Sequence, residues 1–320
     1  MYNFIVNPVS RSGRGGIYWK RVEAVLKKRN IPYHVFFTKR AGHAGELVKR
    51  LEEKMKQSHH RINLHVIILG GDGTVNEAVQ GITDFHAITL SYIPTGSSND
   101  LARDLGISRK PEEALEDILQ KKHDCYMDVG LLKYKEVFAE GREISLPDRR
   151  FVVGCGMGYD AAVCAELLGS GLKEKLNKIG LGKLSYLGIA LKGLIQARFV
   201  NGSLSLDGKE PIPVKGLIFM VGMIHRYEGG GFMFCPAAIA DDGMLDFCLA
   251  AGISKPRILR VLPTAFKGRH LGHRGVESYR AREALLKTEL PLWVHTDGEV
   301  EARARAIHLS VCESKLHMIY

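Results

Sequence analysis

The chain has 320 residues, of which 45% are hydrophobic and 25% are charged, so a disordered protein is excluded and a globular one with buried cores is expected. This length predicts two domains or one large domain. Lys and Arg number 45 against 35 Asp and Glu, which makes the formal net charge +10. The excess favours nucleic acid, anionic lipid or phosphorylated ligands as partners, but a basic surface that only keeps the protein soluble is equally compatible with it.

Two further classes are excluded by pattern. The six cysteines contain no C-x-x-C pair and accompany no His cluster, so neither a zinc site nor a disulfide framework is expected. The N-terminus MYNFIVNP lacks the features of a signal peptide, and no apolar run approaches the roughly 20 residues that span a bilayer. We therefore expect a soluble protein whose contact with membrane is peripheral.

The first 128 residues alternate between short apolar runs and segments with helical periodicity. This alternation predicts an α/β domain in which a parallel sheet carries helices on both faces. The expected strands are Tyr2–Val6, Tyr33–Phe37, Leu64–Leu69 and Ala87–Ile93, and the expected helices are Gly15–Arg29, Ala44–Met55, Thr74–Val79, Leu101–Leu105 and Pro111–Leu119.

After Asp128 the pattern changes to short strands separated by turn signals such as Asp207-Gly208 and Asp242-Gly243. It predicts a mainly antiparallel β-sandwich, interrupted by one helical region over Ala161–Phe199. The expected strands are Val129–Lys133, Phe151–Val153, Ser203–Leu206, Val214–Val221, Met244–Ala250, Leu292–His295 and Ile307–Val311. The domains are therefore placed at 1–128 and 129–304, with residues from about 305 to 320 completing the first.

A glycine-rich turn follows the buried strand at Leu64–Leu69. It reads Gly70, Gly71, Asp72, Gly73, Thr74 and leads into a helix. Glycines bring backbone N–H groups close to an anion, and the N-terminus of the helix adds a positive dipole, so phosphate binding is favoured. A metal ion would reconcile Asp72 with a phosphate. A plain capped connection is the alternative, but it does not require three glycines around one Asp. The turn is neither a Walker loop nor G-x-G-x-x-G.

Two more loops have the same character. Thr95 to Asp100 follow the strand at Ala87–Ile93, and the segment from Asn7 to Gly16 follows the first strand. In open parallel sheets, ligands bind at the carboxyl ends of the strands. Asp100 is also a good helix N-cap, and both roles are compatible.

Four segments in a fixed order resemble the diacylglycerol kinase catalytic family, and within it the soluble bacterial lipid kinases, a group that also includes sphingosine and ceramide kinases. They are NPVSRSG near the start, GGDGTVNE at 70–77, PTGSSNDLAR at 94–103 and DGE at 297–299. Further landmarks fall at Thr38, 151–161, 182–188 and 239–246, so the resemblance runs along the whole chain. GGDGT alone also occurs in phosphofructokinases and NAD kinases. The first loop departs from the usual NP-x-S-G by its extra residues.

The resemblance implies ATP and Mg²⁺ as cofactors and assigns roles to residues of this chain. Asp72 and Asp100 would be catalytic and hold a Mg²⁺ ion with help from Asp128, and Glu299 would be the general base. A structural Mg²⁺ or Ca²⁺ would lie on the Asp242 carboxylate and the carbonyls of Ile239 and Met244. The nucleotide would contact Asn7, Pro8, Ser10, Gly13, Thr38, Gly70, Gly71, Asp72, Gly73, Thr74, Val75, Asn76, Glu77 and Ser97.

From the residues alone, two of these assignments stay open. Asp297-Gly298 is equally compatible with a hairpin turn that leaves Glu299 in solvent, and Asp241-Asp242-Gly243 with a turn that holds no ion.

The expected function is an ATP-dependent lipid kinase that transfers the γ-phosphate to a lipid hydroxyl, with diacylglycerol to phosphatidic acid as the leading reaction. A soluble metabolite kinase of the NAD kinase type would require a downstream Asn-Glu pair and a second Thr-Gly-Ser segment, and the second half has neither in that setting. A non-catalytic lipid-binding protein would be expected to lack Asp72, Asp100 or Glu299, which are all present. No nucleic-acid-binding motif is found.

Two basic stretches are candidates for the surface that contacts a membrane. Gly169–Phe199 is a candidate amphipathic surface helix, although packing on the sheet explains it equally well. Lys255–Arg282 carries eight Lys and Arg and one acid and is the better candidate. We expect a cytoplasmic protein, peripherally associated with the inner face of the membrane, and a homodimer is compatible with the sequence.

Overall fold

The computed structural model describes residues 1–57, 63–139, 142–169, 193–194 and 197–320. They form two compact units, one made of Met1–Val129 with Glu313–Tyr320 and the other of Gly130–Cys312. Most of the helical region predicted over Ala161–Phe199 therefore lies outside the described residues.

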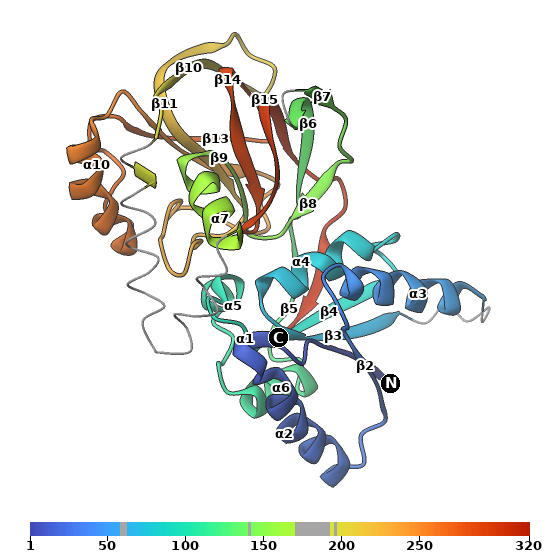
Figure 1. Cartoon of the computed structure of the whole chain (residues 1–320). Helices are drawn as coiled ribbons and strands as arrows, with labels where there is room; N and C mark the ends of the chain where they lie inside the picture. The colour runs from blue at the N-terminus through green and yellow to red at the C-terminus, as the bar shows by residue number, and fades with distance from the viewer. Residues whose placement is uncertain (58–62, 140–141, 170–192, 195–196) are drawn as a thin grey trace. The chain divides into compact units, whose positions relative to one another are not determined.

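The first unit is an α/β domain, as predicted. Its six-stranded sheet has the order β2-β1-β3-β4-β16-β5, and every neighbouring pair is parallel except β16 and β5. Figure 1 shows α3 and α4 on one face of this sheet and α2 and α6 on the other. The elements are β1 (Tyr2–Val6), α1 (Ser10–Gly13), α2 (Gly15–Lys28), β2 (Tyr33–Phe37), α3 (His43–Gln57), β3 (Leu64–Gly70), α4 (Asp72–Gly81), β4 (Ile88–Pro94), α5 (Asp100–Leu105), α6 (Pro111–Leu119), β5 (Asp124–Met127) and β16 (Leu316–Ile319).

The central strands are buried because both faces of the sheet are covered. All seven residues of β4 are buried, and β3 is buried except for the half-exposed His65, which accounts for their nearly continuous apolar sequences. The parallel register pairs Val6 with Leu69 and Gly70 with Pro94. The loops after β1, β3 and β4 therefore leave the same edge of the sheet.

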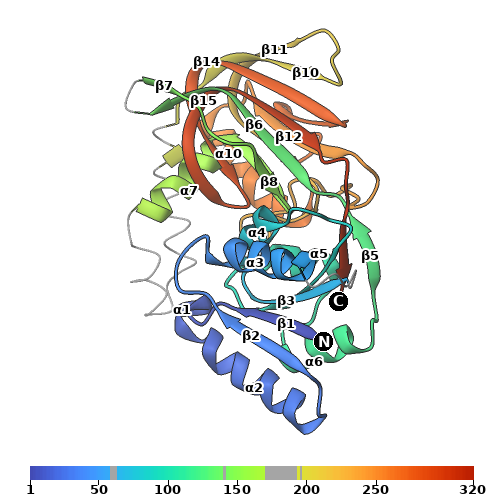
Figure 2. The same ribbon diagram turned by 90° about the vertical axis from the view of Figure 1, so that its right-hand side faces the viewer.

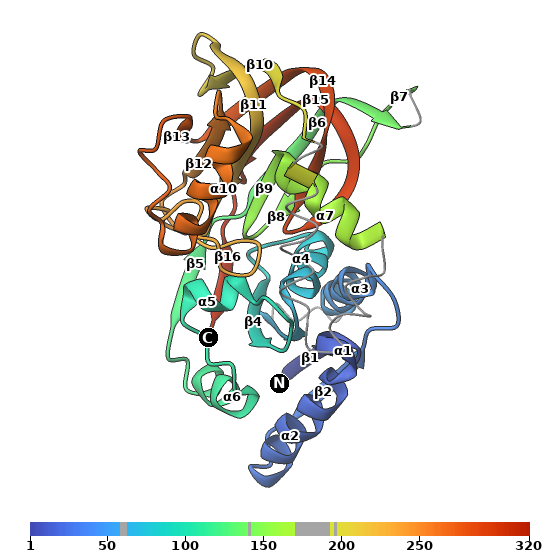
Figure 3. The same cartoon turned by 60° about the vertical axis from the view of Figure 1, so that its left-hand side comes forward.

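The second unit is mainly antiparallel, as predicted, and Figures 1 and 3 show its long strands. The main strand order is β13-β12-β11-β10-β14-β15-β6-β7, with β8 on β6 and β9 on both β11 and β14. The elements are β6 (Gly130–Ala139), β7 (Arg142–Ile144), β8 (Arg149–Phe151), β9 (Gly154–Gly158), α7 (Tyr159–Gly169), β10 (Val200–Leu206), β11 (Ile212–Met223), β12 (Leu245–Ala251), α10 (Lys255–Val261), η1 (Leu262–Lys267), β13 (Val276–Ala281), β14 (Glu283–Thr296) and β15 (Glu299–Val311).

Residues far apart in sequence make the core of this second unit. Met220 of β11, Phe247 of β12, Leu286 of β14 and Ile307 of β15 belong to one cluster and are fully buried. Alternation is clear along β15, where buried alanines at 302, 304 and 306 separate exposed charged residues. Burying one face of each strand fixes its register.

The chain returns to the first unit at its end. After β15 ends at Val311, β16 lies between β4 and β5. Figure 2 shows the red C-terminal strand beside the green β5. The Ser91 hydroxyl donates to the Ile319 carbonyl at 2.6 Å. The piece that completes the first unit is thus Glu313–Tyr320, whereas residues 305–311 lie in β15.

Candidate functional site

Three loops at the carboxyl edge of the first sheet are joined by hydrogen bonds. The Asn7 side-chain amide donates to Oγ1 of Thr74 at 3.0 Å. Oγ of Ser10 and Oγ1 of Thr95 are 2.8 Å apart. The Thr95 amide donates to the Gly70 carbonyl at 2.6 Å. The loops that the sequence singled out after β1, β3 and β4 therefore form one cluster.

Glycines allow two of these loops to touch through their backbones. A Cβ atom on Gly96 would lie 2.6 Å from the Cα atom of Gly71, and one on Gly70 would lie 2.7 Å from Cβ of Thr74. Neither distance is tolerable for a side chain. The glycine-rich composition is therefore required by close packing here, and it leaves the backbone accessible to a ligand.

Asp72 and Asp100 lie side by side at the ends of β3 and β4. The Asp100 amide donates to Oδ2 of Asp72 at 2.8 Å, and the Tyr92 hydroxyl approaches Oδ1 of Asp72 at 3.3 Å. Burial, together with the negative charge of Asp72, raises the pKa of Tyr92 well above its usual value, so Tyr92 remains a proton donor. The Asp100 side chain is buried and forms an ion pair with Arg103 at 2.8 Å.

Two neighbouring carboxylates on adjacent strand ends suit a magnesium ion, because Mg²⁺ prefers hard oxygen ligands and usually binds through one or two carboxylates. Asp72 therefore offers oxygen donors for the ion implied by the sequence, and Asp100 can add a second carboxylate through its Oδ2 atom, since its Oδ1 atom pairs with Arg103. Asp128, the third predicted ligand, is 1% exposed, and its Oδ1 atom lies 3.4 Å from Nζ of Lys315.

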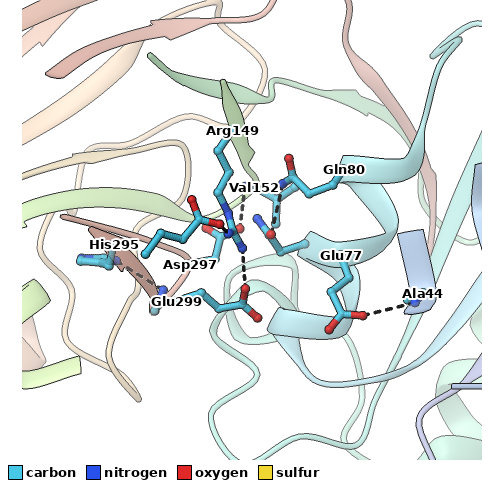
Figure 4. A network of polar contacts seen from close by, with 11 residues as sticks. Ala44, Glu77, Gln80, Arg149, Val152, His295, Asp297 and Glu299 are labelled. Carbon is cyan, nitrogen blue, oxygen red and sulfur yellow. Dashed lines mark hydrogen bonds and ion pairs between the residues drawn. The ribbon is translucent and has the colours of Figure 1, made fainter. Parts of the chain in front are cut away.

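The remaining nucleotide candidates differ in where their side chains lie. Glu77 accepts a hydrogen bond from the Ala44 amide at the start of α3, at 3.2 Å (Figure 4). Val75 and Asn76 are completely buried, so within this unit only their backbone could face a ligand. Thr38 is half-exposed at the end of β2, and Ser97 is exposed.

The unusual first loop adopts a strained conformation. Arg11 and Ser12 have φ angles of 49° and 59°, and Gly13 follows at 88°. Only Gly visits this left-handed region without steric cost. Pro8 is half-exposed, and Gly13 is exposed at the end of the turn. The extra residues of NPVSRSG thus form a tight left-handed turn ahead of α2.

In the second unit, Asp297 is a structural residue. It forms a two-residue hairpin turn with Gly298, with φ angles of 50° and 83°. Its carboxylate accepts hydrogen bonds from the amides of Val152, Val153 and Gly154 at 2.8 to 2.9 Å (Figure 4). The predicted strand over Phe151–Val153 is therefore wrong after Phe151, because residues 152 and 153 turn to donate to Asp297.

Glu299 follows that turn and is ion-paired with Arg149 (Figure 4). The Arg149 guanidinium also pairs with Glu301 and is 14% exposed, whereas the Glu299 side chain is 40% exposed. A guanidinium stabilises the ionised carboxylate. Glu299 is thus held as an accessible anionic acceptor by a partner that the sequence analysis did not identify.

A buried imidazole supports the same turn and was also missed. His295 is 2% exposed, and its Nε2 atom lies 3.0 Å from Oδ2 of Asp160 while its Nδ1 atom lies 3.4 Å from Oε1 of Glu228. Burial lowers the pKa of His295, but the carboxylates of Glu228 and Asp160 outweigh it and raise the pKa to about 9. The charged imidazole forms ion pairs with both carboxylates. The Gly298 amide lies 3.3 Å from the same Nδ1 atom and would donate to it only in the neutral form.

Asp242 is engaged by protein groups. Its Oδ1 atom accepts a hydrogen bond from the Met244 amide at 3.0 Å, and its Oδ2 atom pairs with Arg280. Ile239 is 50% exposed. A cation on Asp242 would have to displace Arg280, so the side chains as arranged do not favour the structural ion, which stays a prediction.

Comparison with known proteins identifies the family. The model of the diacylglycerol kinase catalytic domain matches residues 1–131, and the model of the YegS C-terminal NAD kinase beta sandwich-like domain matches residues 155–319. This chain belongs to the diacylglycerol kinase family. It is 30% identical over 237 residues to a Mycobacterium tuberculosis diacylglycerol kinase. The aligned region covers 73% of this chain and 70% of that relative.

The solved structures of two other kinases share the fold of this protein. A Bacillus anthracis diacylglycerol kinase superposes with a TM-score of 0.71 at 23% identity, covering 100% of this chain and 96% of that one. An Archaeoglobus fulgidus NAD kinase in complex with ATP superposes with a TM-score of 0.52 at 13% identity, covering 100% of this chain and 94% of that one. Family membership makes the chain a phosphotransferase. Among the residues that the structure describes, no helix is both long and apolar enough to cross a bilayer.

Proposed function

We propose that this kinase transfers the γ-phosphate of ATP to the hydroxyl of a membrane lipid, with diacylglycerol as the first acceptor to test. The observation that carries the proposal is the pairing of Asp72 with Asp100, whose backbone amide donates to Oδ2 of Asp72 at 2.8 Å inside a cluster of glycine-rich loops. The relative from Mycobacterium tuberculosis, which is named diacylglycerol kinase, supports the choice of acceptor.

The first unit would bind the nucleotide. The backbone amides of Gly71 to Gly73 at the N-terminus of α4 would present positive charge to phosphate oxygens. When bound, a magnesium ion held by Asp72 and Asp100 would neutralise charge on the phosphates. The hydrogen bonds of Asn7 and Ser10 to the neighbouring loops fix the backbone before the nucleotide arrives.

Glu299 would act as the general base. As the lipid oxygen bonds to the γ-phosphorus, the bond from that phosphorus to the β–γ bridging oxygen breaks, and ADP departs. The hydroxyl proton passes to the Glu299 carboxylate. Arg149 holds this carboxylate in place, and the Asp297 turn fixes where the strand carrying Glu299 begins.

The test is labelled ATP with Mg²⁺ and mixed micelles that contain diacylglycerol, phosphatidylglycerol, a sphingoid base and a polyprenol, followed by identification of the labelled lipid. Glu299→Gln should lower kcat roughly 10²- to 10⁴-fold, the usual contribution of a general base. Asp72→Asn should weaken the dependence of the rate on Mg²⁺. Glu143→Gln, an exposed residue of β7, is the matched control.

Full turnover by Glu299→Gln would refute its role as base. With NAD added to the same mixture, labelling of NAD with no labelled lipid would replace the proposal with the metabolite-kinase alternative.

A further inference from the structure

The segment formed by α10 and η1 packs firmly on the second sheet. Ile258, Val261 and Ala265 are buried. Together with Phe219 of β11 and Ala250 of β12 they line a small apolar cavity. Figure 3 shows α10 lying over β11, β12 and β13. This inner face anchors the segment on the sheet.

The outer face exposes large apolar side chains. Leu259 is 45% exposed and Phe266 is 51% exposed. The Phe266 ring stacks on Phe232 with centroids 4.0 Å apart, and Phe232 stacks on Phe234 at 5.5 Å, which is itself buried. Phe266 is therefore supported from beneath by a column of rings, which holds it at the surface instead of letting it fold inward.

Basic residues flank these exposed apolar side chains in the sequence. From Lys255 to Val276 the chain contains no Asp or Glu. Five bases of this stretch are exposed, and none of them forms an ion pair with the residues that the structure describes. They are Arg257, Arg260, Lys267, Arg269 and Arg274. We call these five bases with Leu259 and Phe266 the α10 surface.

We propose that the α10 surface docks this protein on an anionic lipid bilayer. Exposed apolar side chains flanked by bases match a membrane interface, where the apolar groups enter the acyl boundary and the bases meet anionic headgroups. Charge complementarity favours an anionic bilayer as the partner, since the five bases form no ion pairs with acidic residues of the described chain. The inference rests on the proposed function in one respect, because docking would bring the kinase to its lipid acceptor.

The test measures binding of the full chain to vesicles of phosphatidylglycerol and phosphatidylcholine, and to phosphatidylcholine alone. The parent should bind the mixed vesicles and be released by salt. Arg257→Gln with Arg260→Gln should lower the partition coefficient about thirtyfold, since each base near an anionic surface contributes about fivefold. Phe266→Ser should lower it severalfold at any salt concentration.

Matched controls lie elsewhere on the chain. Lys49→Gln with Arg50→Gln removes the same charge from exposed positions of α3, and Ile212→Ser removes an apolar side chain that is 39% exposed. Both controls should bind like the parent. Unchanged binding of the α10-surface variants, or equal losses in the controls, would overturn the proposal. In a parallel measurement with duplex DNA, binding of the DNA without binding of the vesicles would overturn it too.

Activity separates this inference from the proposed function. The α10-surface variants should phosphorylate a water-soluble short-chain diacylglycerol like the parent and lose activity only on vesicles. Vesicle binding through these residues without any lipid phosphorylation would leave docking in place and refute the kinase proposal. Normal phosphorylation of lipid in micelles without any vesicle binding would refute docking and leave the kinase proposal in place.

Discussion

His295 carries a charge in an almost fully buried position because two carboxylates face it. Asp160 approaches from the start of α7 and Glu228 from the loop after β11, at 3.0 and 3.4 Å. A Cβ atom on Gly156 would lie 2.4 Å from the imidazole, so only glycine leaves room for this arrangement. His295 lies two residues before Asp297, and it thus supports the turn that leads to Glu299.

This arrangement predicts a pH-dependent stability. The pKa of His295 is about 9 in the folded protein against 6.5 for an unperturbed imidazole, so the stabilisation is complete below about pH 6.5 and is lost as pH rises through 9. The loss is on the order of 3 kcal/mol in the free energy of unfolding. His295→Gln should be less stable at pH 6.5 and lack this decline, as followed by urea unfolding. The exposed His273→Gln should retain it. An unchanged decline in His295→Gln would contradict the assignment.

Sequence proximity decided which site residues could be predicted. Asp72 and Asp100 stand in short motifs beside strand ends, so strand order alone brought them together. Arg149 and Glu299 are 150 residues apart, and Asp160 and His295 are 135 apart. Such pairs depend on how antiparallel strands are registered across the whole second sheet, which no local pattern encodes.

At the scale of elements, the apolar strands of the first sheet were predictable, whereas a glycine-rich strand and the more polar β13 were not. β1 and β2 were placed at their observed bounds from apolar content. β9, with the sequence GCGMG, was missed, although all five residues are buried. Glycine is depleted in strands, but Gly154 and Gly156 are required here because side chains of Met223, Asp160 and His295 occupy the space beside them.

The strained first loop yields a prediction at this scale. Ser12 has a φ angle of 59°, where a side chain is unfavourable. Ser12→Gly should raise the free energy of unfolding by about 0.5 to 1 kcal/mol, because relief of strain outweighs the greater entropy of the unfolded chain. Ala41→Gly, at an exposed position without a positive φ, should lower it by a similar amount. Thermal unfolding measures both, and two changes of the same sign would show that Ser12 is not strained.

At the scale of the whole molecule, the sequence predicted two domains and a last strand that returns to the first. The residue at which the chain returns to the first unit was predicted only approximately, because β15 continues to Val311 in the second unit. β16 itself is four residues long, yet it lies between β4 and β5 with parallel and antiparallel neighbours. Its place depends on the open edge of β4, a property of the assembled sheet.

The last prediction concerns this returning strand. Met318 is completely buried between β4 and β5, so Met318→Ala should lower the stability of the first unit by about 2 to 5 kcal/mol. The chain has two tryptophans, and Trp19 lies in the first unit, where it is 4% exposed. In a Trp293→Phe background, urea unfolding followed by fluorescence therefore reports on the first unit alone. Glu313→Ala, at an exposed position just before β16, should leave the transition unchanged.

Because the nucleotide would stabilise only the folded unit, ATP with Mg²⁺ should shift the Met318→Ala transition back toward that of the parent. An unshifted midpoint in Met318→Ala would mean that β16 contributes little to the unit that it completes.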